Sequence, residues 1–101
     1  AHGAIVRIRS KNPRLSDQLA VNYRRAEITP RQRAMLDYAM KVALRSAEVS
    51  DEDFAALRAH GFTLDDIWDI GAIAAFYGMS NRIANMSALR PNDEFYAMGR
   101  V

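Results

Sequence analysis

The amino-acid sequence predicts an all-α protein, and three observations support this fold class. Helix-capping residues precede stretches with helical apolar spacing at Thr29, Ser50 and Thr63. Gly61 follows one of these stretches, in the place where a left-handed residue commonly ends a helix. No segment shows the alternation of apolar and polar residues that is typical of a half-buried strand. We therefore expect helices joined by short turns.

The first ten residues, AHGAIVRIRS, have the pattern of a helix that is already in progress. Ile5 and Ile8 share one face, which Arg7 and Arg9 flank. No capping residue or turn precedes this stretch, and Pro13 disfavours its continuation. A second, shorter helix is expected from about residue 16 to residue 23.

The middle of the chain begins with the clearest helix start. Thr29 is the expected N-cap, Pro30 suits the first helical position, and Gln32 can complete a capping box. This helix should continue to about residue 46. Ser50 is expected to cap a further helix, in which Phe54 and Leu57 are the buried residues. This helix should end at Gly61.

The stretch from Thr63 to Leu89 is predicted to be the core helix of the protein. Every residue from Ile70 to Met79 is apolar or glycine, so no side of the helix is suited to water. The run is shorter than the roughly 20 apolar residues of a membrane span, so we expect no membrane association. The tail from residue 90 onwards is expected to be a loop with one turn at about residues 93–98.

A polar pair, Asn81 and Arg82, directly follows the apolar run. Polar groups on a buried helix need partners or a wet pocket. We therefore predict that Asn81, Arg82 and the nearby Phe76 and Tyr77 either line a substrate pocket or pack in the core.

Composition limits the chemistry that these residues can perform. The chain has 101 residues, half of them hydrophobic, and no cysteine, so it holds neither a disulfide nor a thiolate. The two histidines, His2 and His60, are too far apart in sequence to suggest a metal site, and no cofactor is expected. The apolar surplus favours burial against another chain or a further segment.

The charges are unevenly distributed along the chain. Residues 1–33 hold eight basic and two acidic side chains, a net charge of +6, and residues 34–101 hold six basic and ten acidic side chains, a net charge of −4. A basic end can attract nucleic acid, but a solvated face is the simpler interpretation. No helix-turn-helix pattern is evident, so nucleic-acid binding is not the expected function.

Three segments, AHGAIVRIRSKNP, AVNYRRAEITPRQRAMLDYAMKVA and GFTLDDIWDIGAIAAFYGMSNRIAN, together resemble a known family. In order and spacing they are similar to the C-terminal half of peroxidase-related proteins in the carboxymuconolactone decarboxylase and alkyl hydroperoxidase D superfamily. The resemblance implies a helical bundle of that type. Residues 1–101 would then be a single helical domain, or the C-terminal half of a longer one that starts upstream of residue 1.

The resemblance also implies an active site. The family's motif is C-x-x-C-x-x-x-H, and Ala1-His2-Gly3 fits its end, so His2 would be the catalytic histidine and both cysteines would lie just upstream of Ala1. The family's reaction is reduction of a peroxide by a thiolate, followed by disulfide formation and reduction by an external dithiol. The resemblance further implies a cytoplasmic homo-oligomer.

Two other functions remain open. The first is a cofactor-free carboxymuconolactone-decarboxylase-like enzyme, which would use His2 as a general acid–base and basic residues to hold carboxylates. The second is a non-enzymatic helical module for oligomerisation or nucleic-acid binding. A cysteine pair ahead of Ala1 would favour the peroxidase.

Overall fold

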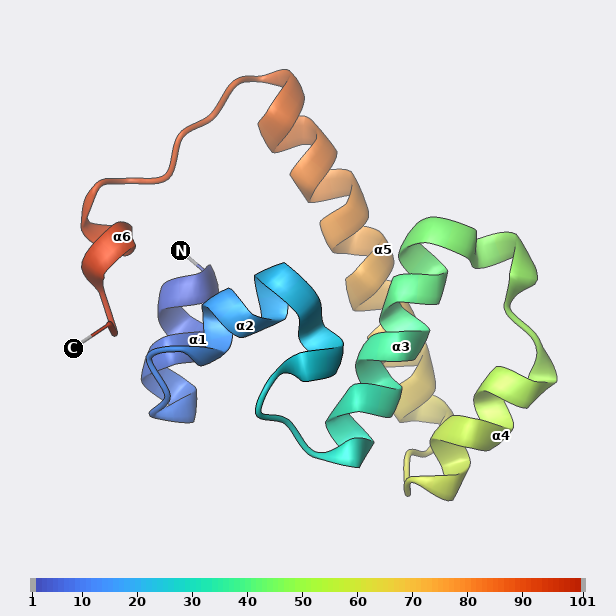
Figure 1. Ribbon diagram of the computed structural model, residues 1–101. Helices are drawn as coiled ribbons and strands as arrows, with labels where there is room; N and C mark the ends of the chain where they lie inside the picture. Colours follow the sequence, from blue (N-terminus) through green and yellow to red (C-terminus); the bar gives the residue numbers. More distant parts are fainter. Residues whose placement is uncertain (1, 101) are drawn as a thin grey trace. The chain divides into compact units, whose positions relative to one another are not determined.

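Figure 1 shows the computed structural model of the chain, in which residues 2–100 are described. All regular secondary structure in these residues is helical, which confirms the predicted fold class. In chain order the elements are α1 (His2–Ser10), α2 (Leu15–Asn22), the 3₁₀ turn η1 (Tyr23–Arg25), α3 (Pro30–Arg45), the 3₁₀ turn η2 (Ser46–Glu48), α4 (Asp51–Ala59), α5 (Leu64–Met86) and α6 (Glu94–Ala97).

The helices form two compact units. Unit 1 comprises residues 2–28 and 89–100 of the described chain, so α1, α2 and η1 share it with α6. Unit 2 is the continuous segment Thr29–Ala88, which contains α3, α4 and α5. The expectation of one helical domain, or half of a longer one, stays a prediction.

The start of α3 is the capping box that the sequence predicts, and Thr63 is the N-cap of α5 as expected. The Thr29 hydroxyl accepts a hydrogen bond from the Gln32 N–H (3.1 Å), and the Gln32 side chain accepts one from the Thr29 N–H (2.9 Å). Thr63 and Asp66 repeat this exchange at 3.1 and 2.8 Å. The hydrogen bond from the Thr63 main chain lowers the pKa of the Asp66 carboxyl below its ordinary value.

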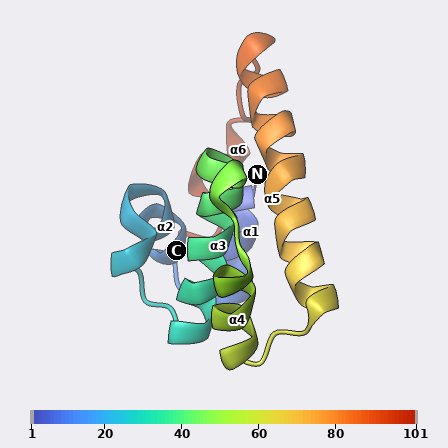
Figure 2. The same cartoon turned by 90° about the vertical axis from the view of Figure 1, so that its right-hand side faces the viewer.

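Unit 2 has a small core at the turn between α4 and α5. Leu57, Phe62 and Ile67 are buried and pack together, and they are flanked by the half-buried side chains of Ala34, Met35, Tyr38, Phe54 and Ile70. Helices α3 and α5 lie side by side in both views (Figures 1 and 2). Gly61 has a positive φ of 87°, and the Phe62 N–H reaches back to the Leu57 carbonyl, which closes the end of α4 as expected.

Two basic side chains of α3 tie the rest of unit 2 to that helix. The Arg31 guanidinium lies 3.9 Å from the centre of the Phe62 ring and donates to the His60 carbonyl at 3.0 Å. Lys41 donates to both carboxylate oxygens of Asp53 on α4, at 3.1 and 2.9 Å. Because Asp53 also accepts from the Ser50 N–H at the start of α4, one carboxylate caps a helix and joins two helices.

The prediction of a buried core helix at Ile70–Met79 is wrong for this chain taken alone. Of the residues of α5, only Ile67 is buried, and Ile73, Phe76 and Met79 are each more than half exposed. Unit 2 offers only α3 and α4 to cover α5, and they cover one side of it. Among residues 2–100, no helix combines the length and apolar character needed to cross a membrane.

The apolar face of α1, which carries Ile5 and Ile8, is not the face that this chain buries. Ile5 and Ile8 are each 52% exposed, whereas Ala4 and Arg7 are buried. Ala4 and Arg7 lie one turn apart on the same side of α1. The buried side of α1 therefore contains a guanidinium in place of the two isoleucines.

We expect the Leu57→Ala substitution to destabilise unit 2 by about 2–5 kcal/mol, because Leu57 is 1% exposed and its loss leaves a cavity. The same substitution at Leu44, which is 71% exposed on α3, should change the free energy of unfolding by less than about 0.5 kcal/mol. Urea denaturation followed by circular dichroism measures both. Equal unfolding midpoints for the two variants would contradict this core.

Candidate active site

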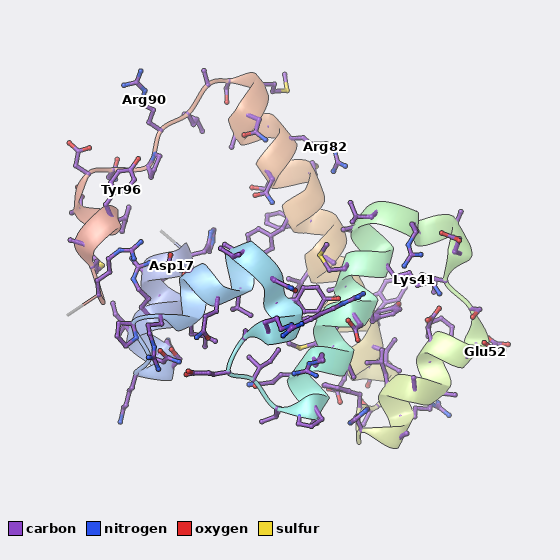
Figure 3. The ribbon with its side chains drawn as sticks, in the orientation of Figure 1. Asp17, Lys41, Glu52, Arg82, Arg90 and Tyr96 are labelled. Carbon is purple, nitrogen blue, oxygen red and sulfur yellow. The ribbon has the colours of Figure 1, made fainter. Side chains whose placement is uncertain are left out.

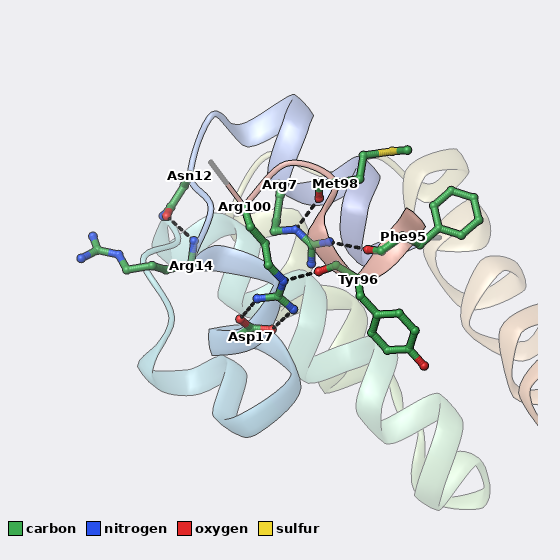
Figure 4. Close-up of polar contacts among 8 residues, drawn as sticks. All are labelled: Arg7, Asn12, Arg14, Asp17, Phe95, Tyr96, Met98 and Arg100. Atoms are coloured by element: carbon green, nitrogen blue, oxygen red, sulfur yellow. Dashed lines mark hydrogen bonds and ion pairs between the residues drawn. The ribbon is translucent and has the colours of Figure 1, made fainter. Parts of the chain in front are cut away.

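The site predicted from the sequence begins at α1, and a buried guanidinium anchors this helix. Arg7 is 4% exposed and has two hydrogen bonds, from Nε to the Met98 carbonyl (2.8 Å) and from Nη2 to the Phe95 carbonyl (2.9 Å) (Figure 4). A buried charge is costly unless hydrogen bonds replace its lost hydration, and the two carbonyls supply them. Arg7 therefore joins α1 to the segment around α6, although some ninety positions separate them in the sequence.

Two glycines allow the elements of unit 1 to approach α1 closely. A Cβ atom on Gly99 would lie 2.9 Å from the Arg7 Cβ atom and 3.2 Å from the Ala4 carbonyl oxygen, and Gly99 also has a positive φ of 78°. A Cβ atom on Gly3 would lie 2.7 Å from the Ser16 hydroxyl oxygen of α2. A larger residue at Gly99 would force the neighbouring elements apart, whereas one at Gly3 requires the Ser16 hydroxyl to move.

A second guanidinium joins the end of the chain to α2. The Arg100 side chain forms an ion pair with Asp17 (Nη1 to Oδ2, 2.7 Å) and donates from Nε to the Tyr96 carbonyl (Figure 4). The hydrogen bond from Arg100 lowers the pKa of the Asp17 carboxyl, and the charge of Arg7 adds to this effect. Sequence patterns gave no signal for Arg7–Phe95, Arg7–Met98 or Asp17–Arg100, because the partners are distant along the chain.

His2 stands at the start of α1, and its side chain is exposed. Ala4 and Arg7 are the buried residues of α1 and hold the helix in place. The His2 imidazole is not among these buried groups and is accessible to a small molecule in solution. The structure thus supplies a rigid support and an accessible histidine. A catalytic role for His2 stays a prediction.

The other predicted site residues lie on α5, in unit 2. Phe76 and Tyr77 contact each other edge to face, with ring centres 5.4 Å apart. Arg82 is exposed (Figure 3), and its Nη1 donates to the Gly78 carbonyl one turn back, at 2.8 Å. Asn81 is exposed as well. The expectation that this polar pair sits in buried surroundings is therefore wrong within this chain, since α5 itself is mostly uncovered.

One hollow in unit 2 involves residues that the sequence did not single out. Tyr38, Ile67, Trp68, Gly71 and Ala72 surround a space of about 270 Å³ between α3 and α5. Burial raises the pKa of the Tyr38 hydroxyl, which meets α5 where Gly71 has no side chain. A tyrosine on the apolar side of a helix, opposite a glycine, is the only signal that the sequence held for this hollow.

A second hollow, of about 430 Å³, lies along α2 in unit 1 and is lined by Arg14, Asp17, Gln18, Val21, Asn22 and Arg25. Arg14 is already paired with Glu27 at 3.0 Å, and Asp17 with Arg100. Within residues 2–100, no three His, Asp or Glu side chains are grouped closely enough to share a metal ion. The polar groups described in unit 1 thus serve mainly to hold its elements together.

Comparison with known proteins identifies the class of fold. The chain superposes on a solved alkylhydroperoxidase AhpD core, an uncharacterized peroxidase-related protein from Ralstonia eutropha JMP134, with a TM-score of 0.98 and 63% sequence identity. It matches another uncharacterized peroxidase-related protein, from Silicibacter sp. TM1040, with a TM-score of 0.95 and 45% identity. Protein-family profiles and curated proteins gave no match. The fold is thus that of an alkylhydroperoxidase AhpD core.

At this level of identity over its whole length, the chain belongs to the alkylhydroperoxidase D-like, peroxidase-related proteins. The resemblance inferred from the three sequence segments is thereby confirmed. The match covers 100% of this chain but 53% of the Ralstonia chain, and 98% of this chain but 52% of the Silicibacter chain. The chain spans about half the length of these relatives.

We expect the Arg7→Leu substitution to release α6 from α1, because it leaves the Phe95 and Met98 carbonyls without their donor. A hydrogen bond to a charged group typically contributes about 1.5–3 kcal/mol, and water takes up part of this loss at partly exposed carbonyls. Hydrogen exchange of residues 94–100 should become faster. Arg9→Leu, the same change at an exposed position of α1, is the control and should leave exchange in residues 94–100 as it was. Unchanged exchange in the Arg7 variant would show that these hydrogen bonds do not hold α6.

The Asp17 carboxyl should titrate below its ordinary pKa of about 3.8. Because the folded-state pKa is lowered, the ion pair stabilises unit 1 above the unfolded-state pKa, and this contribution disappears as the pH falls through the folded-state value. Carboxyl NMR titration measures the pKa directly. In Arg100→Gln the pKa should rise towards the ordinary value, and an identical titration curve in both proteins would rule out the pairing.

Proposed function

We propose that this chain is the histidine-bearing half of a thiol-dependent peroxide reductase of the alkylhydroperoxidase D type. The observation that carries the proposal is the match to a peroxidase-related alkylhydroperoxidase core at 63% identity over the whole of this chain. The accessible imidazole at the start of a firmly anchored helix supports it further. The catalytic thiols would come from a C-x-x-C segment preceding His2, because this chain has no cysteine.

The proposed reaction needs two thiols and one peroxide. A thiolate attacks the peroxide, the O–O bond breaks, and sulfur is oxidised to a sulfenic acid while the other oxygen leaves as an alkoxide and takes up a proton to become an alcohol. The second thiol then displaces the sulfenic hydroxyl as water and forms a disulfide. An external dithiol reduces the disulfide and completes the cycle.

His2 would move the protons in this cycle. In a C-x-x-C-x-x-x-H helix the histidine lies four residues after the second cysteine, which places the two side chains on the same side, one turn apart. From that position an imidazole can take the proton of a thiol and deliver one to the leaving alkoxide. The hydrogen bonds of Arg7 to the Met98 and Phe95 carbonyls would help to hold the helix that carries this histidine.

The predicted site residues of α5 would contribute surface rather than reacting groups. Phe76 and Tyr77 offer an apolar wall, and Arg82 and Asn81 offer polar atoms, on a helix that unit 2 itself leaves half uncovered. As the family resemblance implies, the protein would work as a homo-oligomer. These roles rest on the same family match as the reaction.

In the protein extended to include the C-x-x-C segment, we expect His2→Ala to slow peroxide reduction by about 10²-fold or more, since it removes the proton relay. The rate of peroxide consumption with dithiothreitol as reductant measures the effect. His60→Ala replaces the chain's other histidine, which is exposed at the end of α4, and should leave the rate unchanged. Equal rates for the His2 variant and the unmodified protein, with equal circular dichroism spectra, would remove His2 from the mechanism.

A further inference from the structure

The largest unexplained feature of the structure is an apolar seam along the outer side of α5. We define the α5 seam as Ala72, Phe76, Met79, Ile83 and Met86. Successive members are four, three, four and three residues apart, which is the heptad spacing of helices that pack lengthwise against another helix. Phe76, Met79 and Ile83 are 51–56% exposed, and Met86 is 82% exposed.

The opposite side of α5 is already in use. Ile67 is buried in the core of unit 2, and Ile70 and Gly71 face α3, where the Tyr38 hydroxyl meets the helix. Ala72 also borders the hollow between α3 and α5, but the four larger members of the α5 seam form a separate face of the helix. A contiguous row of large apolar side chains on the surface of a monomer indicates a binding surface.

The relatives indicate what covers this face. Their chains are nearly twice as long as this one, and about half of each lies outside the match, whereas the matched halves superpose with TM-scores of 0.98 and 0.95. The backbone that carries α5 is thus conserved in proteins that possess a further segment of comparable length. We propose that the α5 seam docks a helix of that remaining half of an alkylhydroperoxidase D-like core.

The charges at the two ends of α5 specify the partner helix further. Asp65 and Asp69 are exposed near the N-terminal end of α5, and Arg82 is exposed beside the C-terminal part of the seam. A docking helix should therefore carry basic residues where it passes Asp65 and Asp69 and acidic residues near Arg82, in addition to its own apolar seam. Such flanking charges determine which helix binds and whether it runs parallel or antiparallel to α5.

The chain contains its own reporter for this contact. Trp68 is the only tryptophan, is 77% exposed, and precedes Ala72 of the seam by one helical turn. A helix that covers the seam should also shield the Trp68 indole from water. Its fluorescence emission then shifts to shorter wavelength.

The test uses the part of the Ralstonia eutropha chain that lies outside the match, with any tryptophan replaced by phenylalanine. This segment is placed ahead of the present chain through a protease-cleavable linker, and the product is purified and cleaved. We expect the two parts to remain together as a 1:1 complex in size-exclusion chromatography with light scattering. The Trp68 emission should lie at shorter wavelength in the complex than in the chain alone.

The double substitution Met79→Glu and Ile83→Glu should cause the two parts to separate after cleavage. Both side chains are exposed, and glutamate favours helix, so α5 should retain its circular dichroism signal. The matched control is Val21→Glu, the same kind of change at a residue of α2 that is 87% exposed, and it should leave the complex intact. If the two parts separate in the unmodified protein, the double variant and the Val21→Glu variant alike, or in none of them, the proposal is overturned.

Two further results would also overturn it. The chain alone could be a dimer that the double substitution converts to a monomer. If the Ralstonia segment then fails to displace the second copy from this dimer, a second copy covers the seam. If the chain alone is a monomer whose Trp68 emission is already that of a buried indole, its own residues cover the seam. Neither measurement depends on peroxide turnover, so failure of the thiol mechanism would leave the docking result intact.

Discussion

The chain carries more apolar side chain than its own residues can cover, and this shortage determines much of the structure. Half of the sequence is hydrophobic, yet within residues 2–100 only Leu57, Phe62 and Ile67 are buried together in a core. Small chains bury a low fraction of their surface, and a long helix such as α5 presents apolar groups on every side. Unit 2 packs one side of α5 and leaves the other uncovered, which is why that helix, the most hydrophobic part of the sequence, exposes Ile73, Phe76 and Met79.

Polar contacts compensate where apolar packing is thin. Arg7 is buried against two main-chain carbonyls in unit 1, and in unit 2 Arg31 covers the Phe62 ring while Lys41 holds Asp53 of α4. Each of these side chains has an apolar stem that packs and a charged end that finds a fixed acceptor or ring. They orient the helices without the volume of a large core. A similar stabilisation by exposed ion pairs alone would be weak.

The shortage of residues to cover the apolar surface also bears on the function of this chain. The fold is that of a peroxidase-related alkylhydroperoxidase D-like protein, and about half the length of such proteins is represented. The chain offers an accessible imidazole on an anchored helix and a wide apolar surface, and it has no thiol. Under the proposed function, the thiols and the cover for the apolar surface would both come from the other half of an alkylhydroperoxidase D-like core. Apolar surface that is excessive for one segment is therefore appropriate for a segment that completes a larger helical assembly.

The sequence by itself determined the features that depend on residues close together in the chain. The helix starts at Thr29 and Thr63, the left-handed Gly61 and the all-α class all rest on contacts within about one helical turn, so the local pattern was sufficient. Only the tertiary structure decided which faces are buried. Arg7 is enclosed because its acceptors lie 88 and 91 residues away, whereas the α5 seam is open because nothing in unit 2 reaches it. Helical periodicity shows which residues share a face, but burial depends on what the rest of the chain brings against it.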